Sequence, residues 1–250
     1  MGKRERLDKV LVERGLVASR EEGRRRILAG EVLVRERPMT KAGELIDANA
    51  EIRLRGDSLP YVSRGGVKLE GALRHFGIDV RDKVALDIGA STGGFTDCLL
   101  AFGARRVYAV DVGYGQLHWR LRTDPRVVLL ERTNVRYLKE SDLGEAPDLA
   151  TIDVSFISLR LVLPVVYGLL APAGIALALV KPQFEVGKGK VGKGGVVRSQ
   201  EDRLRSVEDV RAAALAIGFS ARGLFESPLP GPKGNREFFL YLERPAAGRS

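Results

Sequence analysis

The sequence predicts an α/β fold, with a small α+β part at the N-terminus and a larger part built on a mostly parallel, doubly wound sheet. Two observations favour this class. From about residue 84 onward, short apolar runs alternate with helical segments, which is the pattern of parallel strands joined by helices. Before residue 60, two helical segments precede several short strand-like runs. We place a first domain at residues 1–60 and a second at 61–250, joined by a glycine-rich hinge at about 56–67.

The first domain is expected to fold around two helices. Apolar residues at helical spacing place the first helix from Leu7, and Gly15 ends it. Ser19, with Glu22 three residues later, forms a capping box that opens a second helix running to about Gly30. The expected remaining elements are a strand at 31–35, a turn at Arg37–Pro38 and a closing strand at 51–55.

The second domain is expected to hold seven strands. They lie at 84–87, 106–111, 126–130, 149–153, 174–180, 219–226 and 237–243. The expected helices are 69–76, 93–102, 158–170 with a break near Pro164, and 201–217. One face of the last helix carries Leu204, Val207, Val210, Ala214 and Ile217. The final two strands are too close for a helical crossover, so one of them is expected to be antiparallel.

The composition favours a polyanionic partner. Lys and Arg number 41 against 32 Asp and Glu, a net charge of +9, which is typical of nucleic-acid binding but also serves solubility. A single cysteine, Cys98, excludes an internal disulfide framework and fits a reducing compartment. Residues 1–8 lack the apolar core of a signal peptide, and no apolar run reaches the ~18 residues of a membrane span. We therefore expect a cytoplasmic protein without a stable membrane association.

Clusters of basic side chains are candidates for RNA contact, since arginine and lysine neutralise phosphate. They are Lys9, Arg20, Arg24, Arg25 and Arg26 in the first domain, Arg64 in a mobile basic turn at 63–68, and Lys188, Lys190 and Lys193 in the glycine-rich segment 187–195. The alternative for the helical cluster is a solvated face. For the segment 187–195, a loop that closes over RNA and a disordered loop are both open readings.

The first domain resembles the S4 RNA-binding domain. The likeness rests on residues 6–20, RLDKVLVERGLVASR, on residues 30–34, GEVLV, and on the order of helix, basic helix and small sheet. The resemblance implies that the second helix presents its arginines to structured RNA, mainly through phosphates and with limited sequence readout.

The loop after strand 84–87 is a candidate cofactor site. Glycines at 89, 93 and 94 allow close backbone approach to a ligand, and Asp111 ends the next strand at the distance expected for a carboxylate that accepts from ribose hydroxyls. The spacing departs from the Gly-x-Gly-x-x-Gly of NAD sites. Asp87 repels a pyrophosphate and suits a cationic ligand. The alternative is a structural glycine turn.

The segment Asp87-Ile-Gly-Ala-Ser-Thr-Gly-Gly-Phe-Thr96 resembles the S-adenosylmethionine loop of class I (Rossmann-like) methyltransferases. The resemblance implies that Gly89, Ser91 and Gly93 cradle the methionine moiety. It places Asp111 on the ribose and Thr133 and Asn134 near the adenine. The full set expected at the cofactor is Asp87, Gly89, Ser91, Thr92, Gly93, Gly94, Phe95, Asp111, Thr133, Asn134 and Asp153.

Four chargeable residues fall at or near edges of the expected sheet: Lys68, Asp153, Lys181 and Glu237. Lys181 follows a seven-residue apolar run and precedes Pro182, so it lies at the strand end where open α/β sheets bind ligands. Burial there disfavours the ammonium form and would make the lysine a usable base. A lysine that merely extends from a strand end into water is the alternative reading.

The four residues, in this order, resemble the Lys-Asp-Lys-Glu tetrad of FtsJ-like 2′-O-ribose methyltransferases. With the S4-like domain and the motifs Asp153-Val-Ser-Phe-Ile-Ser158 and Val180-Lys-Pro-Gln-Phe-Glu185, nearly the whole chain is similar to the TlyA family, ribosomal RNA methyltransferases once labelled hemolysins. The resemblance implies S-adenosylmethionine-dependent 2′-O-methylation of ribosomal RNA. It points to cytidines of the large subunit, with the small subunit as a second candidate.

The chemistry of the tetrad follows from the weak nucleophilicity of a ribose hydroxyl, which needs a nearby base. Lys181 is our candidate for steering or taking the proton, and which lysine is the formal base stays open. Asp153 and Glu237 would orient the lysines and the hydroxyl. Lys68 would stabilise developing negative charge or position a phosphate.

Two rival functions remain at this point. The first is base methylation: methylation at C5 needs a cysteine nucleophile, and Cys98 lies in a helix where packing is the better explanation. Amino-group methylation usually carries prolines that Asp153-Val-Ser-Phe156 lacks, although Phe156 could stack on a base or pack in the core. The second rival is a non-enzymatic RNA-binding or cytolytic role. His75 and His118 are the only histidines, so we expect no metal site.

Overall fold

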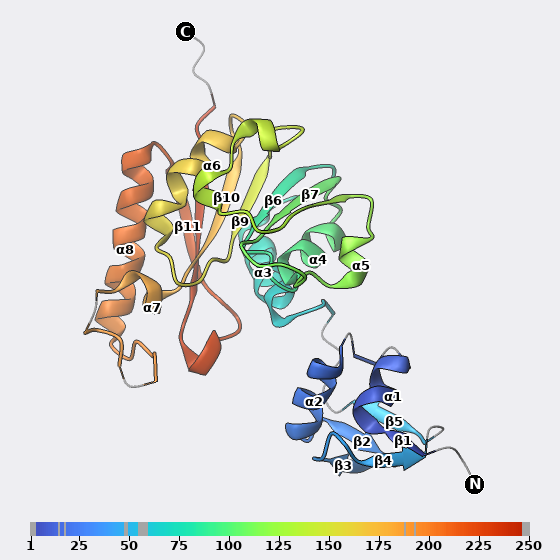
Figure 1. Ribbon diagram of the computed structural model, residues 1–250. Helices are drawn as coiled ribbons and strands as arrows, with labels where there is room; N and C mark the ends of the chain where they lie inside the picture. Colours follow the sequence, from blue (N-terminus) through green and yellow to red (C-terminus); the bar gives the residue numbers. More distant parts are fainter. Residues whose placement is uncertain are drawn as a thin grey trace. The chain divides into compact units, whose positions relative to one another are not determined.

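The computed structural model describes residues 4–14, 16–17, 19–47, 50–54, 60–187, 189–192 and 194–246. The chain divides into two compact units, Met1–Leu59 and Pro60–Ser250, which we describe separately (Figure 1). The expected helix end at Gly15 and the hinge positions 56–59 lie outside the described residues.

The N-terminal unit packs two helices against short antiparallel strands. Its helices are α1 (Leu7–Glu13) and α2 (Arg20–Leu28). Ser19 caps α2 as expected, since its hydroxyl accepts from Glu22 N at 3.2 Å. The strands form a pair, β1 (Arg4–Arg6) with β4 (Leu45–Asp47), and a three-stranded sheet of β3 (Arg37–Met39), β2 (Val32–Val34) and β5 (Ile52–Leu54). The core consists of Leu7, Val10, Leu11, Val17, Ile27, Val32 and Ile46.

The expected turn at Arg37–Pro38 is wrong, because both residues belong to β3. Val34 pairs with Arg37, and the two residues between them, Arg35 and Glu36, turn the chain with φ of 49° and 63°. Such a two-residue hairpin needs positive φ at both central positions. Pro38 is tolerated because β3 is an edge strand, where a missing N–H is not needed for the ladder.

The larger unit is built on one seven-stranded sheet, as expected. Its order is β11-β12-β10-β9-β6-β7-β8. The parallel strands are β6 (Val84–Ile88), β7 (Arg106–Val110), β8 (Val127–Leu130), β9 (Leu149–Ile152) and β10 (Ile175–Val180). The expected antiparallel strand is β12 (Phe238–Glu243), which runs against both β10 and β11 (Ser220–Glu226).

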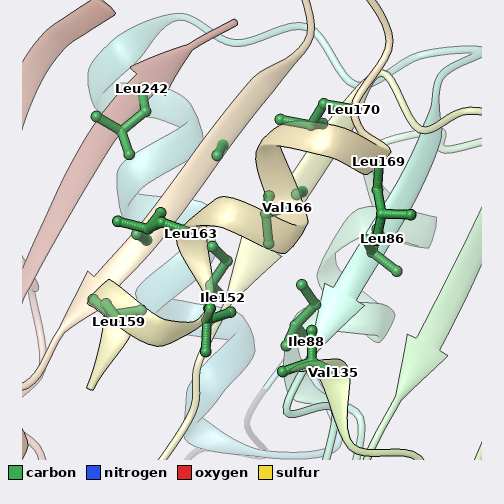
Figure 2. Packing of buried hydrophobic residues seen from close by; sticks show 14 of the residues in the cluster. Leu86, Ile88, Val135, Ile152, Leu159, Leu163, Val166, Leu169, Leu170 and Leu242 are labelled. Carbon is green, nitrogen blue, oxygen red and sulfur yellow. The ribbon is translucent and has the colours of Figure 1, made fainter. Parts of the chain in front are cut away.

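Helices cover both faces of this sheet. On one face lie α3 (Arg64–Phe76), α4 (Gly94–Ala101) and the short α5 (Trp119–Arg122). On the other lie the 3-10 helices η1 (Val135–Tyr137) and η3 (Leu159–Leu161) together with α6 (Leu163–Leu169) and α8 (Gln200–Ile217). Figure 2 shows side chains of α6, among them Leu163 and Val166, packed with Ile152, Leu86 and Ile88 of the central strands. Three short helices, η2 (Glu140–Asp142), α7 (Pro182–Glu185) and η4 (Pro232–Gly234), complete the unit.

Two expectations about helices are corrected. Residues 64–68 are not a mobile turn but the first turn of α3, which begins where Ser63 accepts from Gly65 N at 3.3 Å. The glycine at 66 serves close packing, because a Cβ there would lie 2.3 Å from Tyr61 Cγ. On α8, Val207, Val210 and Ala214 are buried, but Leu204 is 48% exposed and does not belong to the packed face.

None of the described helices combines the length and the apolar character needed to cross a bilayer.

Candidate active site

All four tetrad residues lie at one edge of the large sheet. Asp153 follows β9 and Lys181 follows β10, whose carboxyl ends meet at the same edge because the strands are parallel. Glu237 precedes β12, and the antiparallel register, with Val180 opposite Phe238, brings its start to that edge as well. Lys68 reaches the edge from the first turn of α3.

These residues form two ion pairs. Lys68 Nζ lies 2.6 Å from Glu237 Oε2, and Lys181 Nζ lies 2.5 Å from Asp153 Oδ1. Both lysine side chains and Glu237 are at most 10% exposed, whereas Asp153 is 24% exposed. Charges buried to this degree are stable only when paired, so each lysine is fixed by its carboxylate. Lys181 also donates to Ser155 Oγ at 3.0 Å.

The tetrad lines a cavity of about 280 Å³ together with the β6–α4 loop. The lining includes Lys68, Asp153, Lys181 and Glu237, the loop residues Gly89, Ser91, Thr92, Gly94 and Phe95, and the exposed Arg64. A hydroxyl nucleophile placed in this cavity would therefore meet two ammonium groups and the glycine loop at once.

A second, larger cavity of about 790 Å³ shares Gly89, Ser91 and Asp153 with the first. Its lining also contains Asp111, Thr133 and Asn134, which the sequence predicts at a bound nucleoside. Asp111 already accepts from Ser91 N at 2.8 Å and Gly113 N at 2.7 Å. Because each carboxylate oxygen can accept a further bond, Asp111 retains capacity for two ribose hydroxyls.

Gly89 lines both cavities, at the point where the glycine loop passes close to the end of β9. Its φ is +83°, and a Cβ at this position would lie 2.6 Å from the carbonyl oxygen of Asp153. No side chain fits between the loop and the end of β9. The close approach of the two backbones therefore explains why position 89 is a glycine.

Asp87 and Gly93 do not line either cavity. Asp87 is fully buried behind the loop, where it accepts from Thr96 Oγ1 at 2.6 Å and Thr151 Oγ1 at 3.1 Å. Burial raises the pKa of Asp87 to about 7. Gly93 caps α4 with φ of +97°, and a Cβ there would lie 2.3 Å from Leu121 Cδ1. Both residues shape the loop from within.

The basic side chains predicted to contact RNA differ in whether a carboxylate of the protein already binds them. In the N-terminal unit the buried Asp8 accepts from Arg6 at 3.0 Å, Arg20 at 3.0 Å and Arg24 at 3.2 Å. Two further basic candidates on the helices are paired: Lys9 with Glu5 and Glu13, and Arg26 with Glu22. Arg25 is exposed and makes no ion pair with a described residue. In the larger unit Lys190 pairs with Asp202, and Lys188 and Lys193 lie outside the described residues.

Three residues near the site were missed or left open by the sequence. Phe156 is 91% exposed with φ of +65° and lines the larger cavity, so the alternative that it packs in the core is wrong. Ser155 bonds Lys181, and the buried Glu185 bonds the same loop further on. Both lie inside the motifs around Asp153 and Lys181, but their partners are 26 residues away in sequence.

Cys98 is fully buried, and burial raises its thiol pKa to about 12, which fits packing and not reactivity. Within the described ranges no group of three or more His, Cys, Asp and Glu side chains is arranged to hold a metal ion.

Comparison with known proteins assigns both units. Residues 61–244 match the FtsJ-like methyltransferase family, and residues 5–52 match the S4 domain. The chain is 51% identical over 248 residues to the candidate rRNA methyltransferase YqxC of Bacillus subtilis, covering 99% of this chain and 88% of that protein. It is 49% identical to the 16S/23S rRNA (cytidine-2′-O)-methyltransferase TlyA of Mycobacterium tuberculosis, covering 97% and 91%.

A solved structure of a hemolysin-type protein from Streptococcus thermophilus superposes with a TM-score of 0.77 at 46% identity, covering 98% of this chain and 90% of that one. The matches thus span both units and nearly the whole sequence. The chain belongs to the TlyA family, in which an S4 domain precedes an FtsJ-like methyltransferase domain.

Proposed function

We propose that this protein transfers a methyl group from S-adenosylmethionine to a ribose 2′-hydroxyl of ribosomal RNA. The observation that carries the proposal is the meeting of two lysine–carboxylate pairs in one cavity beside the glycine loop. The name of the Mycobacterium tuberculosis relative supports cytidine as the acceptor nucleoside. We propose a target in the large subunit, with the small subunit as the second candidate, and action in the cytoplasm.

The lining of the larger cavity suits the cofactor. Asp111 offers carboxylate oxygens to the ribose, and Thr133 and Asn134 offer polar groups to the adenine. Ser91, Thr92, Gly94 and Phe95 bring the loop backbone to the methionine end, where the two cavities join. Asp87 and Gly93 support this loop from behind. When bound, the cofactor supplies an electrophilic methyl group on a sulfonium.

The four tetrad residues then act on the hydroxyl. Lys181 steers the attacking 2′-hydroxyl or, as a neutral amine after its own proton has passed to Asp153 or to water, takes the proton that the hydroxyl loses. Asp153 fixes the direction of the Lys181 side chain. Lys68 stabilises the negative charge that develops on the oxygen, or positions the neighbouring phosphate, while Glu237 fixes Lys68. The catalytic contribution of the two carboxylates is to hold both lysine amino groups in place before the substrate arrives.

The N-terminal unit serves as the RNA anchor in this proposal. Arg20 and Arg24 are held side by side by Asp8, and each guanidinium keeps further N–H donors for phosphate. Arg25 is the exposed cation of α2. Lys9, Arg26, Arg64 and Lys190, with Lys188 and Lys193, complete the proposed RNA contacts.

Transfer of labelled methyl groups to purified ribosomal subunits tests the proposal. Alkaline digestion of the product distinguishes the rivals, because a 2′-O-methyl group leaves a dinucleotide that alkali cannot cleave, whereas a methylated base does not. Label recovered in that dinucleotide is the expected result. Label recovered only in mononucleotides would replace the proposal with base methylation, and no transfer with active cofactor would point to a binding role.

A further inference from the structure

The segment that follows β9, residues 153–159, is held at both of its ends by the short helix α7 and the residue that precedes it. We call this segment the site loop. At its start, Lys181, the residue that precedes α7, pairs with Asp153 and donates to Ser155 Oγ at 3.0 Å. At its far end, Glu185, the last residue of α7, accepts from Ser158 Oγ at 2.6 Å and Leu159 N at 2.8 Å.

Phe156 lies in the middle of the site loop in a conformation that needs support. Its φ of +65° is in the left-handed region, which a residue with a bulky side chain rarely adopts. Phe156 is 91% exposed, and its ring lies at a centroid distance of 5.0 Å from the ring of Phe184 in α7. An exposed aromatic side chain in a strained backbone conformation is a feature of recognition sites and not of core packing.

Glu185 is a buried carboxylate for which the proposed methyl transfer has no direct use. Its side chain is 2% exposed, and it lines neither of the two cavities of the site. Both of its hydrogen bonds go to the site loop, and Arg160 Nε approaches only to 4.0 Å. Burial raises the pKa of Glu185, because removal from water disfavours the charged carboxylate. Because a buried acceptor that loses its donors is costly, Glu185 keeps the two groups that donate to it, Ser158 Oγ and Leu159 N, in place.

We propose that Glu185 is a positioning residue for the acceptor nucleotide. It fixes the far end of the site loop, so that Phe156 stays exposed at the larger cavity and Ser155 stays bonded to Lys181. The inference rests on the proposed methyl transfer to RNA and deepens it. It assigns to α7 the task of fixing Phe156, the exposed ring that we place against the acceptor base, together with the lysine that handles the proton.

Steady-state methyl transfer by Glu185→Ala tests the inference. A loosened site loop misplaces both Phe156 and Lys181, and we expect kcat/KM for RNA to fall about 10²-fold, since misplacement by ~1 Å can cost that much. KM for RNA should rise and kcat should fall. Because residues 154–158 also line the larger cavity, the dissociation constant for S-adenosylmethionine is measured as well, and it should rise less than KM for RNA. Glu185→Gln should recover part of the activity, because its amide oxygen can still accept from Leu159 N.

Ser206→Ala is the matched control. Ser206 is buried like Glu185 and lines a small third cavity with it, but its hydroxyl donates to Arg203 O at 2.7 Å within α8 and not to the site loop. This variant loses a buried polar group without loosening the site loop, so its kinetic constants should match the wild type. Thermal unfolding of both variants separates a general loss of stability from the positioning effect.

A single-tryptophan reporter gives a readout besides activity. Trp119 is the only tryptophan, so Trp119→Phe with Phe156→Trp places one fluorophore on the site loop. Adding Glu185→Ala should lower the fluorescence anisotropy of this reporter, whereas adding Ser206→Ala should not. If Glu185→Ala does not fold, Ser158→Ala, which removes one of the two bonds, is compared with the same control.

Three outcomes decide. Reduced kcat/KM and reduced anisotropy in Glu185→Ala, with partial recovery in Glu185→Gln, support the positioning role. Kinetic constants and anisotropy equal to those of Ser206→Ala overturn it while leaving the methyl transfer intact. A wild-type protein that transfers no methyl group overturns the proposed function itself, and the anisotropy measurement then still reports whether Glu185 holds the site loop.

Discussion

Lys68 Nζ lies 2.6 Å from Glu237 Oε2, although 169 residues separate the two in sequence. The pair joins the first turn of α3 to the start of β12 and is almost completely removed from water. Its surroundings are tight, because a Cβ on Gly231 would lie 1.8 Å from Glu237 Oε1. Because the pair is enclosed in this way, removing one partner would leave the other as a buried charge without a counter-charge.

Lys68→Met is expected to destabilise the protein by about 3–5 kcal/mol, because it leaves a buried carboxylate without a counter-charge. The double variant Lys68→Met with Glu237→Gln removes the orphaned charge and should recover most of that loss, but no methyl transfer. Urea unfolding of the single and double variants measures the difference. Equal stability of Lys68→Met and wild type would mean that the pair is solvated in the protein.

Lys181→Ala is expected to reduce kcat by about 10²–10⁴-fold, the range for loss of a positioned acid–base group. Binding of S-adenosylmethionine and RNA should change little. Asp153 is 24% exposed and can be hydrated after the loss of its partner, so the stability cost should be smaller than for Lys68. Arg222→Ala is the matched control, since it also removes a cation paired with a carboxylate, Glu243, but outside both cavities. Single-turnover methyl transfer decides, and an unchanged rate in Lys181→Ala would exclude Lys181 from the mechanism.

The sequence predicts the tetrad at the sheet edge because apolar runs mark where strands end, and the ends of parallel strands share an edge. The sequence does not predict which lysine of the tetrad forms an ion pair with which carboxylate. The pairing of Lys68 with Glu237 depends on β12 entering the sheet beside β10, and strand order is a property of long-range packing. The same reason hides Glu185, whose donors come from a loop that only the folded sheet brings beside α7.

The errors of the sequence interpretation are local. Pro38 and Gly65-Gly66 are residues typical of turns, but tertiary contacts place them in an edge strand and in a helix. The strands β1 and β4 have three residues each, too few for an alternating pattern to be recognised. Phe156 could not be assigned from sequence, because exposure of an aromatic residue depends on a backbone conformation that its own type disfavours.

Arg25→Glu is expected to weaken RNA binding more than any other single charge reversal on α2, because Arg25 is exposed whereas Arg26 is paired with Glu22. The affinity should fall at all salt concentrations tested, and the slope of log K against log salt should decrease by about one phosphate contact. Arg211→Glu makes the same charge change on α8 and serves as the control. Equal affinities of the two variants would assign the effect to net charge and not to α2.

Asp8→Asn is expected to weaken RNA binding although it makes the protein more positive. Asp8 accepts from three guanidinium groups, and the loss of its charge releases Arg20 and Arg24 from their common position. We expect roughly a tenfold loss of affinity, the equivalent of one charge-assisted hydrogen bond. Filter binding at several salt concentrations measures it. An increase in affinity would show that simple electrostatics, and not the arrangement of the arginines, governs binding.

The carboxylate of Asp8 also makes the free energy of unfolding depend on pH. The Arg6 guanidinium, with Arg20 and Arg24, holds the pKa of Asp8 well below its ordinary value. A group whose pKa is lowered by folding contributes stability that is present above its unfolded pKa and is lost as the pH falls toward the folded one. Wild-type protein should therefore lose stability below about pH 4, and Asp8→Asn should lose less over that range in urea unfolding.

Asp87 is expected to have the opposite effect on stability, which should fall as the pH rises. Burial raises its pKa from 3.8 to about 7, so the folded protein keeps a proton that the unfolded chain has already released. The contribution of the protonated carboxyl is fully present below pH 3.8 and is lost as the pH rises through about 7. Three pH units correspond to at most roughly 4 kcal/mol. Asp87→Asn has no proton to lose and should remove this decline between pH 4 and 7.

Urea unfolding at intervals across that range, without cofactor, checks the prediction. Glu208→Gln is the control, because the pKa of Glu208 is lowered by Arg211 and its removal cannot abolish a decline with rising pH. Since Asp87 accepts from Thr96 and Thr151 as an ionised group, a wild-type profile parallel to that of Asp87→Asn would mean that these hydroxyls outweigh burial and keep the carboxylate charged behind the loop.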